Sequence, residues 1–488
     1  MDYNIVLVTE SFLAGAPFSN GSSTNEAGLS RIDLLALQDL ASRNELTNLT
    51  VDDCSEEFSS AFNKDFRNVL LVTSVNLPGS SLVATSKSGS SLSPYTTSTG
   101  TNKQITLDGS AVRFCLAQPA DPSSQNCTVS LNGSLLGITL LLNLVTVVAT
   151  AGVLLFKASS FEPLVTLGDA LTSFLKDIDP TTRDACLLTK TDVWQGRWGL
   201  REAKYWVPRD HWWVRTPSLP RWLFTSFLWL CITGMAASAL AVTTHLEPTG
   251  HLSSLGNASP HAVSMLPASA PASAAALVAS LPQVLLGMLY LATNALLTTF
   301  FLSHESTLYS AGQRHPLRVS ADPEGHQTTS LYLTLPRPVS WLLVALFTAM
   351  GFVLSQSCFV VAIKLSPAST TSPGSNSTLV ALGFSGVGLL TLLALLVMLA
   401  ALVLGLAFRR APPAVMLNGQ AVGNPLALPS GSCSAVLSAR CHRIPGETDV
   451  WQWPVAWGVV HEGLGMEVSH CTYSARGVGQ LDAARSYA

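Results

Sequence analysis

The side chains best suited to bind a metal ion gather near the C-terminal end of the sequence. They are Cys433, Cys441, His442, His461, His470 and Cys471. Thiolates and imidazoles are the usual protein ligands of zinc. Their spacing, however, contains no paired C-x-x-C motif or comparable zinc pattern. The sequence therefore favours reduced structural cysteines in a small cytosolic module, and we predict neither a metal site nor a cofactor.

The sequence contains no catalytic motif that names a reaction. It has no Walker loop, no dinucleotide-binding fingerprint, no H-E-x-x-H and no G-x-S-x-G. The formal net charge of −3 excludes a nucleic-acid binder that works by bulk basicity. We therefore predict no catalytic residue, and we expect neither an enzyme nor a nucleic-acid-binding protein.

The composition is typical of a membrane protein. Hydrophobic residues make up 48 % of the chain and charged residues only 12 %, where soluble domains carry about a quarter. Five stretches without an internal charge are long enough to cross a bilayer: residues 135–156, 222–243, 275–302, 340–363 and 379–408. Since lipid offers the backbone no hydrogen-bond partner, each must be helical. The expected fold is mainly α, a polytopic helical membrane protein with about five transmembrane helices.

The charges between these stretches predict an orientation, because positive residues stay on the cytosolic side. Residues 157–221 contain ten Lys or Arg, whereas 244–274 contain none. Residues 303–339 contain Arg314, Arg318 and Arg337, whereas 364–378 contain only Lys364. We therefore expect loops 157–221 and 303–339 and the tail 409–488 in the cytosol. Region 1–134 and loops 244–274 and 364–378 are expected outside, with the bilayer of the plasma membrane or another secretory-pathway membrane between them.

Six N-glycosylation sequons agree with this orientation. They begin at Asn20, Asn48, Asn126, Asn132, Asn257 and Asn376. All six fall on the predicted outer side, so we expect a glycoprotein. Asn132 lies within a few residues of the first span, which brings it close to the membrane.

The region 1–134 is polar and acidic, with thirteen Asp or Glu and seven Lys or Arg. Apolar alternations at residues 68–75 and 105–117 predict strands, and the Ser- and Thr-rich residues 80–101 predict a flexible loop. Cys54, Cys115 and Cys127 lie in a predicted oxidising space, so we expect one disulfide among them. No signal peptide is visible at the start, which suggests that an upstream segment is missing.

Two features of the loop 157–221 point to surface packing. Apolar residues recur at helical spacing from Leu164 to Ile178, and we favour a helix packed on the membrane or on the bundle over one that docks a partner. Farther on, tryptophans alternate with cations between Trp194 and Arg215. Nucleic-acid stacking is one interpretation of such a pattern. We favour anchoring at the membrane interface, where indoles lie at headgroup depth and cations meet anionic lipid.

The polar residues within the spans allow two interpretations. They are Asn143, Thr146, Thr225, Thr233, Asn294, Thr298, Ser355 and Gln356. Hydrogen bonds between helices are the favoured interpretation, and a pore lined by Asn143, Asn294 and Gln356 is the alternative. His304 and Glu305, at the inner end of the third span, are interpreted as a solvated helix end rather than a titrating pair.

Eight segments carry a family resemblance. They are YNIVLVTESFLAGAPF (3–18), PLVTLGDALTSFLKDIDPTTRDACLLTK (163–190), LPQVLLGMLYLATNALLTTFFL (281–302), PLRVSADPEGHQTTSLYLTL (316–335), LSQSCF (354–359), GSCSAVLSARCH (431–442), VAWGVV (455–460) and the pair His470-Cys471. In these the chain resembles an uncharacterised group of fungal multispanning membrane proteins, named only for an N-terminal domain of unknown function. The resemblance implies a multispanning fold and no known activity. It also implies further spans upstream of residue 3, which this chain lacks.

Two functions remain as hypotheses. The first is a non-enzymatic receptor, sensor or scaffold that binds cytosolic proteins through loop 157–221 and the tail. The alternative is a transporter or channel for a neutral or apolar solute, although no inverted repeat is evident.

Overall fold

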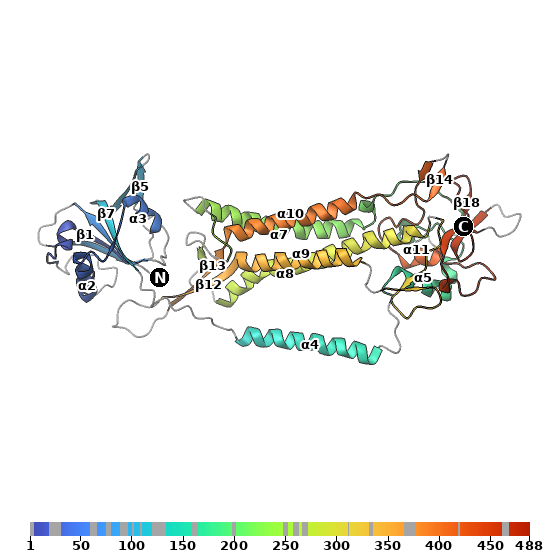
Figure 1. The fold of residues 1–488 in the computed structure, drawn as a ribbon, viewed down its shortest axis with the longest axis horizontal. Coiled ribbons are helices and arrows are strands. Elements are labelled where there is room, and N and C mark those ends of the chain that lie inside the picture. Colours follow the sequence, from blue (N-terminus) through green and yellow to red (C-terminus); the bar gives the residue numbers. More distant parts are fainter. Residues whose placement is uncertain are drawn as a thin grey trace. The chain divides into compact units, whose positions relative to one another are not determined.

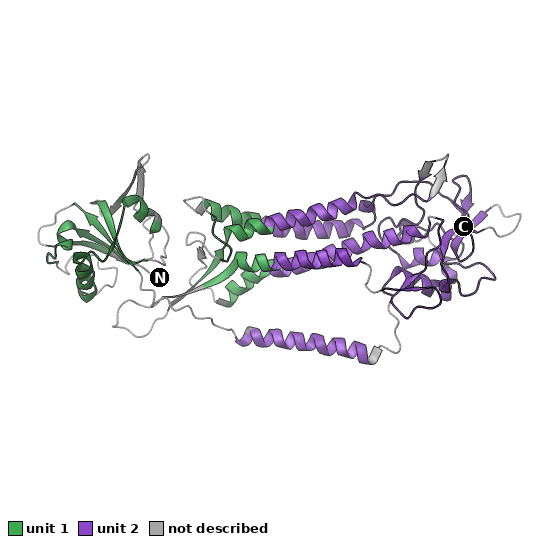
Figure 2. Ribbon diagram, viewed as in Figure 1, with its two compact units in different colours: residues 1–131, 235–282, 352–392 green, residues 132–234, 283–351, 393–488 purple. Residues whose placement is uncertain are grey.

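The computed structural model describes residues 4–18, 31–58, 66–74, 80–87, 96–99, 102–107, 110–119, 133–157, 164–197, 202–246, 252–256, 263–265, 272–310, 312–330, 335–365, 377–417, 420–460 and 468–488. The chain is mainly helical and divides into two compact units (Figure 2). Unit 1 comprises residues 1–131, 235–282 and 352–392, and unit 2 comprises residues 132–234, 283–351 and 393–488.

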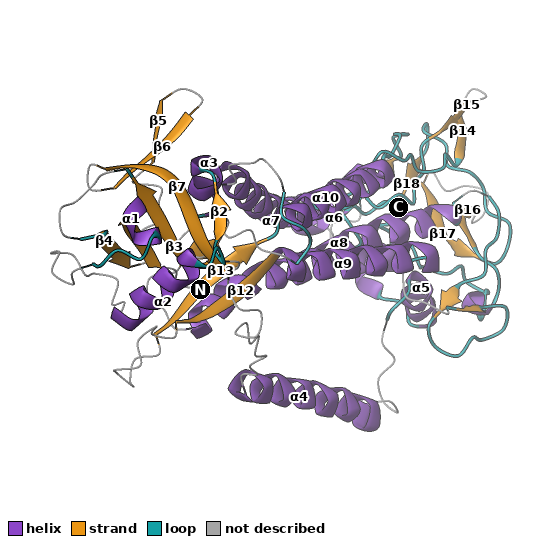
Figure 3. Cartoon of the chain, turned by 60° about the vertical axis from the view of Figure 1, so that its left-hand side comes forward, coloured by secondary structure: helices purple, strands orange, loops and turns teal. Residues whose placement is uncertain are grey.

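The N-terminal part of unit 1 is a mixed sheet with helices on both faces (Figure 3). Its strand order is β4-β1-β3-β7-β6-β5, and β2 pairs with β7. Its strands are β1 (Asn4–Thr9), β2 (Thr47–Leu49), β3 (Phe66–Thr73), β4 (Leu82–Lys87), β5 (Thr96–Thr99), β6 (Asn102–Leu107) and β7 (Ser110–Pro119). Its helices are α1 (Glu10–Leu13), α2 (Arg31–Ser42) and α3 (Val51–Glu57). Strands therefore form where the apolar alternations predicted them.

The central strand β1 is buried on both faces because each face is covered by a helix. Ile5 and Leu7 lie in a core with Cys54 and Phe58, on the side of α3. Val6 and Val8 lie in the opposite core with α2. This accounts for β1 being a continuous apolar run rather than an alternation.

One N-terminal prediction was wrong. Residues 80–101 were predicted to be a flexible loop, but β4 pairs antiparallel with β1, and β5 pairs with β6. Leu82 and Ala84 are buried in β4. Thr and Val favour strands, so a Ser- and Thr-rich composition hides an edge strand as readily as it marks a loop.

Five helices are long and apolar enough to cross a membrane. They are α4 (Gly133–Lys157), α7 (Leu219–Leu246), α8 (Ala272–Leu308), α9 (Arg337–Ser357) and α10 (Gly386–Ala407). Each overlaps one predicted span. No part of the most apolar window of α4 is buried inside the protein, whereas the other four helices are partly buried.

The predicted boundaries of the fourth and fifth spans were wrong at one end each. Helix α9 ends at Ser357, and residues 358–365 form β12 (Cys358–Leu365) instead of extending the helix to 363. Residues 377–384 form β13 (Ser377–Phe384), so α10 begins at Gly386 and not at 379. The two strands pair antiparallel, and β9 (Val263–Met265) pairs with β13. An apolar run that continues a helix cannot be distinguished from a buried strand by hydrophobicity alone.

Within unit 2, α7–α10 run side by side (Figure 1). The indole of Trp229 on α7 donates to the carbonyl of Leu396 on α10, at 3.0 Å. Tyr290 on α8 packs edge-on against Phe347 on α9, with ring centroids 5.3 Å apart. Aromatic side chains therefore join neighbouring helices of the bundle.

Short elements joined by long loops complete unit 2 (Figure 3). The helices are α5 (Leu167–Lys176), α6 (Lys190–Trp194) and α11 (Ser434–Ala439), with 3-10 turns at Pro180–Thr182, Trp213–Arg215 and Val450–Gln452. The strands are β8 (Lys204–Tyr205), β10 (Arg318–Val319), β11 (Thr328–Thr329), β14 (Val415–Leu417), β15 (Gln420–Val422), β16 (Ala456–Val460), β17 (Val468–Ser474) and β18 (Ser486–Tyr487). Four of these strands form one sheet, with the order β16-β17-β18-β8.

Candidate functional site

Three segments that are far apart in the sequence share one hydrophobic core. We call the described residues of 164–218, 309–330 and 409–488 the module. The core contains Leu171 from the first segment, Leu317 from the second, and Val455, Trp457 and Tyr473 from the third. These are the three segments that the charge pattern assigns to one side of the spans. The module therefore forms only when two loops and the tail come together.

Helix α5 belongs to this core and does not lie on a surface. Leu167, Leu171 and Leu175 are each at most 1 % exposed. The amphipathic stripe was correctly placed on a helix, but its apolar face is covered by the tail and by the loop after α8. Neither a membrane surface nor a docked partner is needed to bury it.

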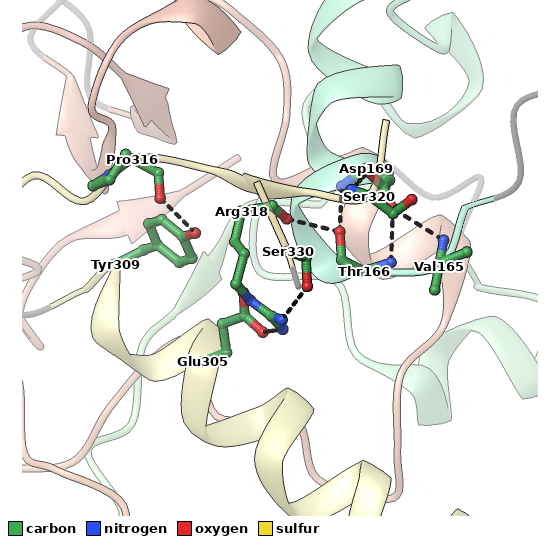
Figure 4. Close-up of polar contacts among 9 residues, drawn as sticks. All are labelled: Val165, Thr166, Asp169, Glu305, Tyr309, Pro316, Arg318, Ser320 and Ser330. Atoms are coloured by element: carbon green, nitrogen blue, oxygen red, sulfur yellow. Dashed lines mark hydrogen bonds and ion pairs between the residues drawn. The ribbon is translucent and has the colours of Figure 1, made fainter. Parts of the chain in front are cut away.

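A capping box starts α5 and also binds the second segment (Figure 4). The hydroxyl of Thr166 accepts from the backbone N–H of Asp169, and the carboxylate of Asp169 accepts from the backbone N–H groups of Val165 and Thr166. Ser320 donates to the same carboxylate through its backbone N–H at 2.7 Å and its hydroxyl at 2.8 Å. Burial raises the pKa of Asp169, but the hydrogen bonds from Thr166 and Ser320 outweigh it and leave the pKa lowered. Asp169 thus holds two segments together as a carboxylate.

The first turn of α5 lies so close to β10 that only glycine fits at position 168. The hydroxyl of Thr166 donates to the carbonyl of Arg318 at 2.7 Å. A Cβ built at Gly168 would collide with the backbone of Arg318. The absence of a side chain at Gly168 therefore permits the approach of strand to helix.

The side chain of Arg318 continues the connection to the end of α8 (Figure 4). Its guanidinium binds both carboxylate oxygens of Glu305, at 3.1 and 2.8 Å, and donates to the hydroxyl of Ser330. Both partners are largely buried, with side-chain exposures of 20 % and 16 %. The prediction that Glu305 lies at a solvated helix end was therefore wrong. His304 instead packs its ring against Trp213, with centroids 5.4 Å apart.

Asn424 forms a second connection, between α8 and the segment after α10. This buried amide donates to the carbonyls of Thr307 and Pro412, at 3.1 and 2.9 Å. Its oxygen accepts from the hydroxyl of Ser310 at 2.6 Å and from the backbone N–H of Leu426. All four hydrogen-bonding positions of the amide are occupied, so Asn424 fixes the module to the last turn of α8.

The residues of the tail that could in principle bind a metal ion lie in different places. Cys441 and Cys471 lie inside the module core with Cys186, and all three are free thiols. His442 and His470 have ring centroids 6.4 Å apart, but the first contacts Thr182 and the second the backbone oxygen of Ala488. Cys433 is half-buried, and His461 lies outside the described residues. Within the described part of the chain, no three His, Cys, Asp or Glu are placed to hold a metal ion.

Two of the three core thiols, Cys186 and Cys441, interact with the buried cation Arg440. Arg440 is 6 % exposed, and its Nε has no hydrogen-bond partner in the structure. The Cys471 thiol donates to Cys186 and, with help from the Arg440 charge, lowers the Cys186 pKa despite burial. The same hydrogen bond to Cys186 raises the pKa of Cys471, and burial raises the pKa of Cys441. Cys186 is therefore the thiol best able to carry negative charge beside Arg440.

The N-terminal candidates are only partly described. Cys54 and Cys115 form a disulfide between α3 and β7, and Cys127 lies outside the described residues. Asn48 is exposed on β2. The other sequons, at Asn20, Asn126, Asn132, Asn257 and Asn376, lie outside the described residues.

The polar residues of the spans lie in different surroundings. Asn143 is exposed on α4, a helix whose apolar window has no buried residue. Asn294 is half-buried on α8. Gln283, which the sequence did not single out, donates to the carbonyl of Gly351 and joins α8 to α9. Hydrogen bonds between helices are thus represented in the bundle.

Sequence reasoning missed most of the residues that connect the module to the bundle. The capping box of Thr166 and Asp169 has a readable spacing. Arg318 and Asn424 belong to no local sequence motif, because their hydrogen-bond partners lie in other segments of the chain.

The comparisons with known proteins place the chain in a family without assigning an activity. No curated protein matches the chain, and no solved structure matches it either. A family model described as a domain of unknown function, DUF8419, matches residues 200–483, which is more than half of the chain. The match includes α7–α10 and most of the module, and it excludes the N-terminal sheet. The chain therefore belongs to the family of proteins that share the DUF8419 domain.

Proposed function

We propose that the protein is a multi-pass receptor, sensor or scaffold without enzymatic activity, in the plasma membrane or another secretory-pathway membrane. In this proposal the N-terminal sheet and loops 244–274 and 364–378 lie outside, and the module lies in the cytosol. The module presents the surface that cytosolic proteins bind. The observation that carries the proposal is the assembly of two loops and the tail around one core, fixed to the end of α8.

Cysteine chemistry supports this orientation. The N-terminal sheet holds a disulfide, whereas Cys186 and Cys471 contact each other inside the module and remain thiols. Disulfides persist in oxidising compartments, and thiols remain reduced in the cytosol. The two regions thus have the cysteine states expected on opposite sides of a membrane.

A glycosidase gel-shift series tests the orientation. The expected result is a shift for the wild-type chain that becomes smaller in Asn257→Gln and in Asn376→Gln. No change in either variant would contradict the proposed outer loops, and the topology would have to be redrawn.

Proximity labelling from the C-terminus tests the partner function. Asn424→Ala removes four hydrogen bonds, among them those to Thr307 and Ser310 at the end of α8, while Gln195→Ala removes an exposed amide of the same module. We expect a reproducible set of labelled cytosolic proteins that is lost in Asn424→Ala and kept in Gln195→Ala at equal expression. The same labelled set in both variants and in a membrane-tethered label alone would overturn the proposal.

A further inference from the structure

The segment before α7 is joined to the segment after α10 by a short stretch of β-structure. Trp212 and Arg410 form an antiparallel bridge. The backbone N–H of Trp213 donates to the carbonyl of Arg409 at 2.9 Å, and that of Ala411 donates to the carbonyl of His211 at 2.8 Å. Two chain segments almost two hundred residues apart are therefore held in fixed register.

Aromatic packing attaches this stretch to the helix ends. Trp213 is 3 % exposed and packs against Phe300 and Phe301 on α8, with centroids 5.9 and 5.6 Å away. Trp222, near the start of α7, donates its indole N–H to the carbonyl of Val214. The ends of α7, α8 and α10 thus meet around one tryptophan.

Five exposed arginines lie in or within a few residues of these joined segments, and we call them the arginine collar. They are Arg209, Arg215, Arg221, Arg409 and Arg410. The guanidinium of Arg410 lies 4.5 Å from the ring centre of Trp212, and that of Arg409 lies 5.1 Å from the ring centre of Trp213. None of the five forms a salt bridge with a carboxylate among the described residues, although the exposed Asp210 is nearby in sequence. A guanidinium stacked on a ring keeps its N–H groups free to bind an oxyanion.

The collar lies where the apolar helices stop. Helix α7 begins at Leu219 and α10 ends at Ala407. Large apolar side chains next to the arginines are exposed, including Leu223 (61 %) and Phe408 (64 %). In a membrane these side chains contact acyl chains, and the arginines then lie at the depth of the phosphate groups.

We infer that the arginine collar binds the phosphate groups of anionic phospholipids on the module side of the membrane. This inference rests on the proposed membrane placement. Each stacked guanidinium, that of Arg409 over Trp213 and that of Arg410 over Trp212, offers bidentate N–H groups to a headgroup phosphate, while Arg215 and Arg221 provide further positive charge. Because both tryptophans position the stacked arginines, the collar is a preformed site rather than a diffuse charge.

Native mass spectrometry of the detergent-solubilised full chain tests this inference. Phosphatidylserine, phosphatidylcholine and inorganic phosphate are titrated separately. One basic residue near an anionic surface contributes roughly 1 kcal/mol, or about fivefold in affinity. We therefore expect phosphatidylserine to bind roughly 25-fold more weakly to R409Q/R410Q than to the wild type. R409K/R410K keeps the charge but lacks the stacked, bidentate guanidinium groups, so we expect it to recover only part of the binding.

Two further variants separate a specific loss from a folding defect. R215Q/R221Q leaves the stacked pairs intact and is expected to show a smaller loss than R409Q/R410Q. R183Q/R485Q removes two exposed arginines elsewhere in the module and is expected to bind like the wild type. Equal affinity for the two lipids, an equal loss in R183Q/R485Q, or binding of inorganic phosphate as tight as that of the lipid would overturn the inference. Since the titration needs no assigned compartment, its failure is distinguishable from failure of the glycosylation test.

Discussion

Gly168 and Asp169 are neighbours that serve different physical purposes in the same contact. Gly168 makes room for the backbone of Arg318, whereas Asp169 supplies the charge that binds Ser320. Gly168 is needed because it has no side chain, and Asp169 is needed because its carboxylate accepts hydrogen bonds. Substitutions at the two positions should therefore fail in different ways.

Gly168→Ala tests the steric requirement. The added methyl group collides with the backbone of Arg318, so α5 or β10 must move. Overpacking of this kind costs about 1–3 kcal/mol. Hydrogen exchange of the full chain should show lost protection over residues 167–176 and 312–330. Gly477→Ala is the control, because a Cβ there meets no atom within 4 Å, and unchanged exchange in both variants would contradict the close approach.

Asp169→Asn tests the charge and its dependence on pH. The carboxylate accepts four hydrogen bonds from Val165, Thr166 and Ser320, and an amide cannot replace them all. We expect a loss of about 2 kcal/mol in module stability at neutral pH. Because folding lowers the Asp169 pKa, its contribution is complete above the unfolded pKa of about 3.9 and is lost as the pH falls through the folded value.

The measurement is module stability from pH 6 to pH 2 in both proteins. The wild-type advantage should be constant above about pH 4 and should shrink below it. An advantage that does not change over this range would show that the ionised form of Asp169 is not what binds Ser320.

The end of α8 is the element on which the module depends. Arg318 reaches it through Glu305, and Asn424 reaches it through Thr307 and Ser310. A shift of α8 along its axis would strain both connections together. This gives the bundle a direct physical means of influencing the module.

Glu305→Gln should weaken one of these connections. It leaves the Arg318 guanidinium without a charged partner in a largely buried place, at a cost of about 1–3 kcal/mol. Faster exchange is expected over residues 312–330, with no change in the N-terminal sheet. Glu324→Gln breaks the exposed pair with Lys176 and should cost less than about 1 kcal/mol. If Glu324→Gln destabilised the module as much as Glu305→Gln, the buried pair of Glu305 and Arg318 would contribute no more than the exposed pair.

The helices were more predictable than their ends and their contacts. Five helices could be predicted because an uncharged apolar run of about twenty residues seldom occurs outside a membrane span. The strands β12 and β13 could not, since runs such as those around Val361 and Leu379 are apolar in either conformation. Asp169 was recognisable as part of a helix start, but its bond to Ser320 joins residues 151 apart and leaves no local pattern.

The N-terminal sheet contains a disulfide, whereas the core cysteines of the module are thiols, so the two regions should respond differently to reduction. It joins cysteines 61 residues apart, which in the chain-entropy model contributes about 4 kcal/mol. We expect C54S/C115S, or mild reduction, to increase proteolysis of residues 31–119. The module, whose core cysteines are thiols, should keep its protection. Simultaneous loss of protection in both regions would contradict this independence.

The module also sets an order of events during synthesis. Leu167, Leu171 and Leu175 are made early, but they are covered by side chains as late as Tyr487. At about 5–20 residues per second, roughly 15–60 seconds separate the two during translation. Until the tail is made, the apolar face of α5 lacks the tail side chains that cover it in the folded protein. We therefore expect the newborn chain to bind chaperones that shield apolar faces. A ribosome that stalls before the tail should leave the five long apolar helices complete and the module unfinished.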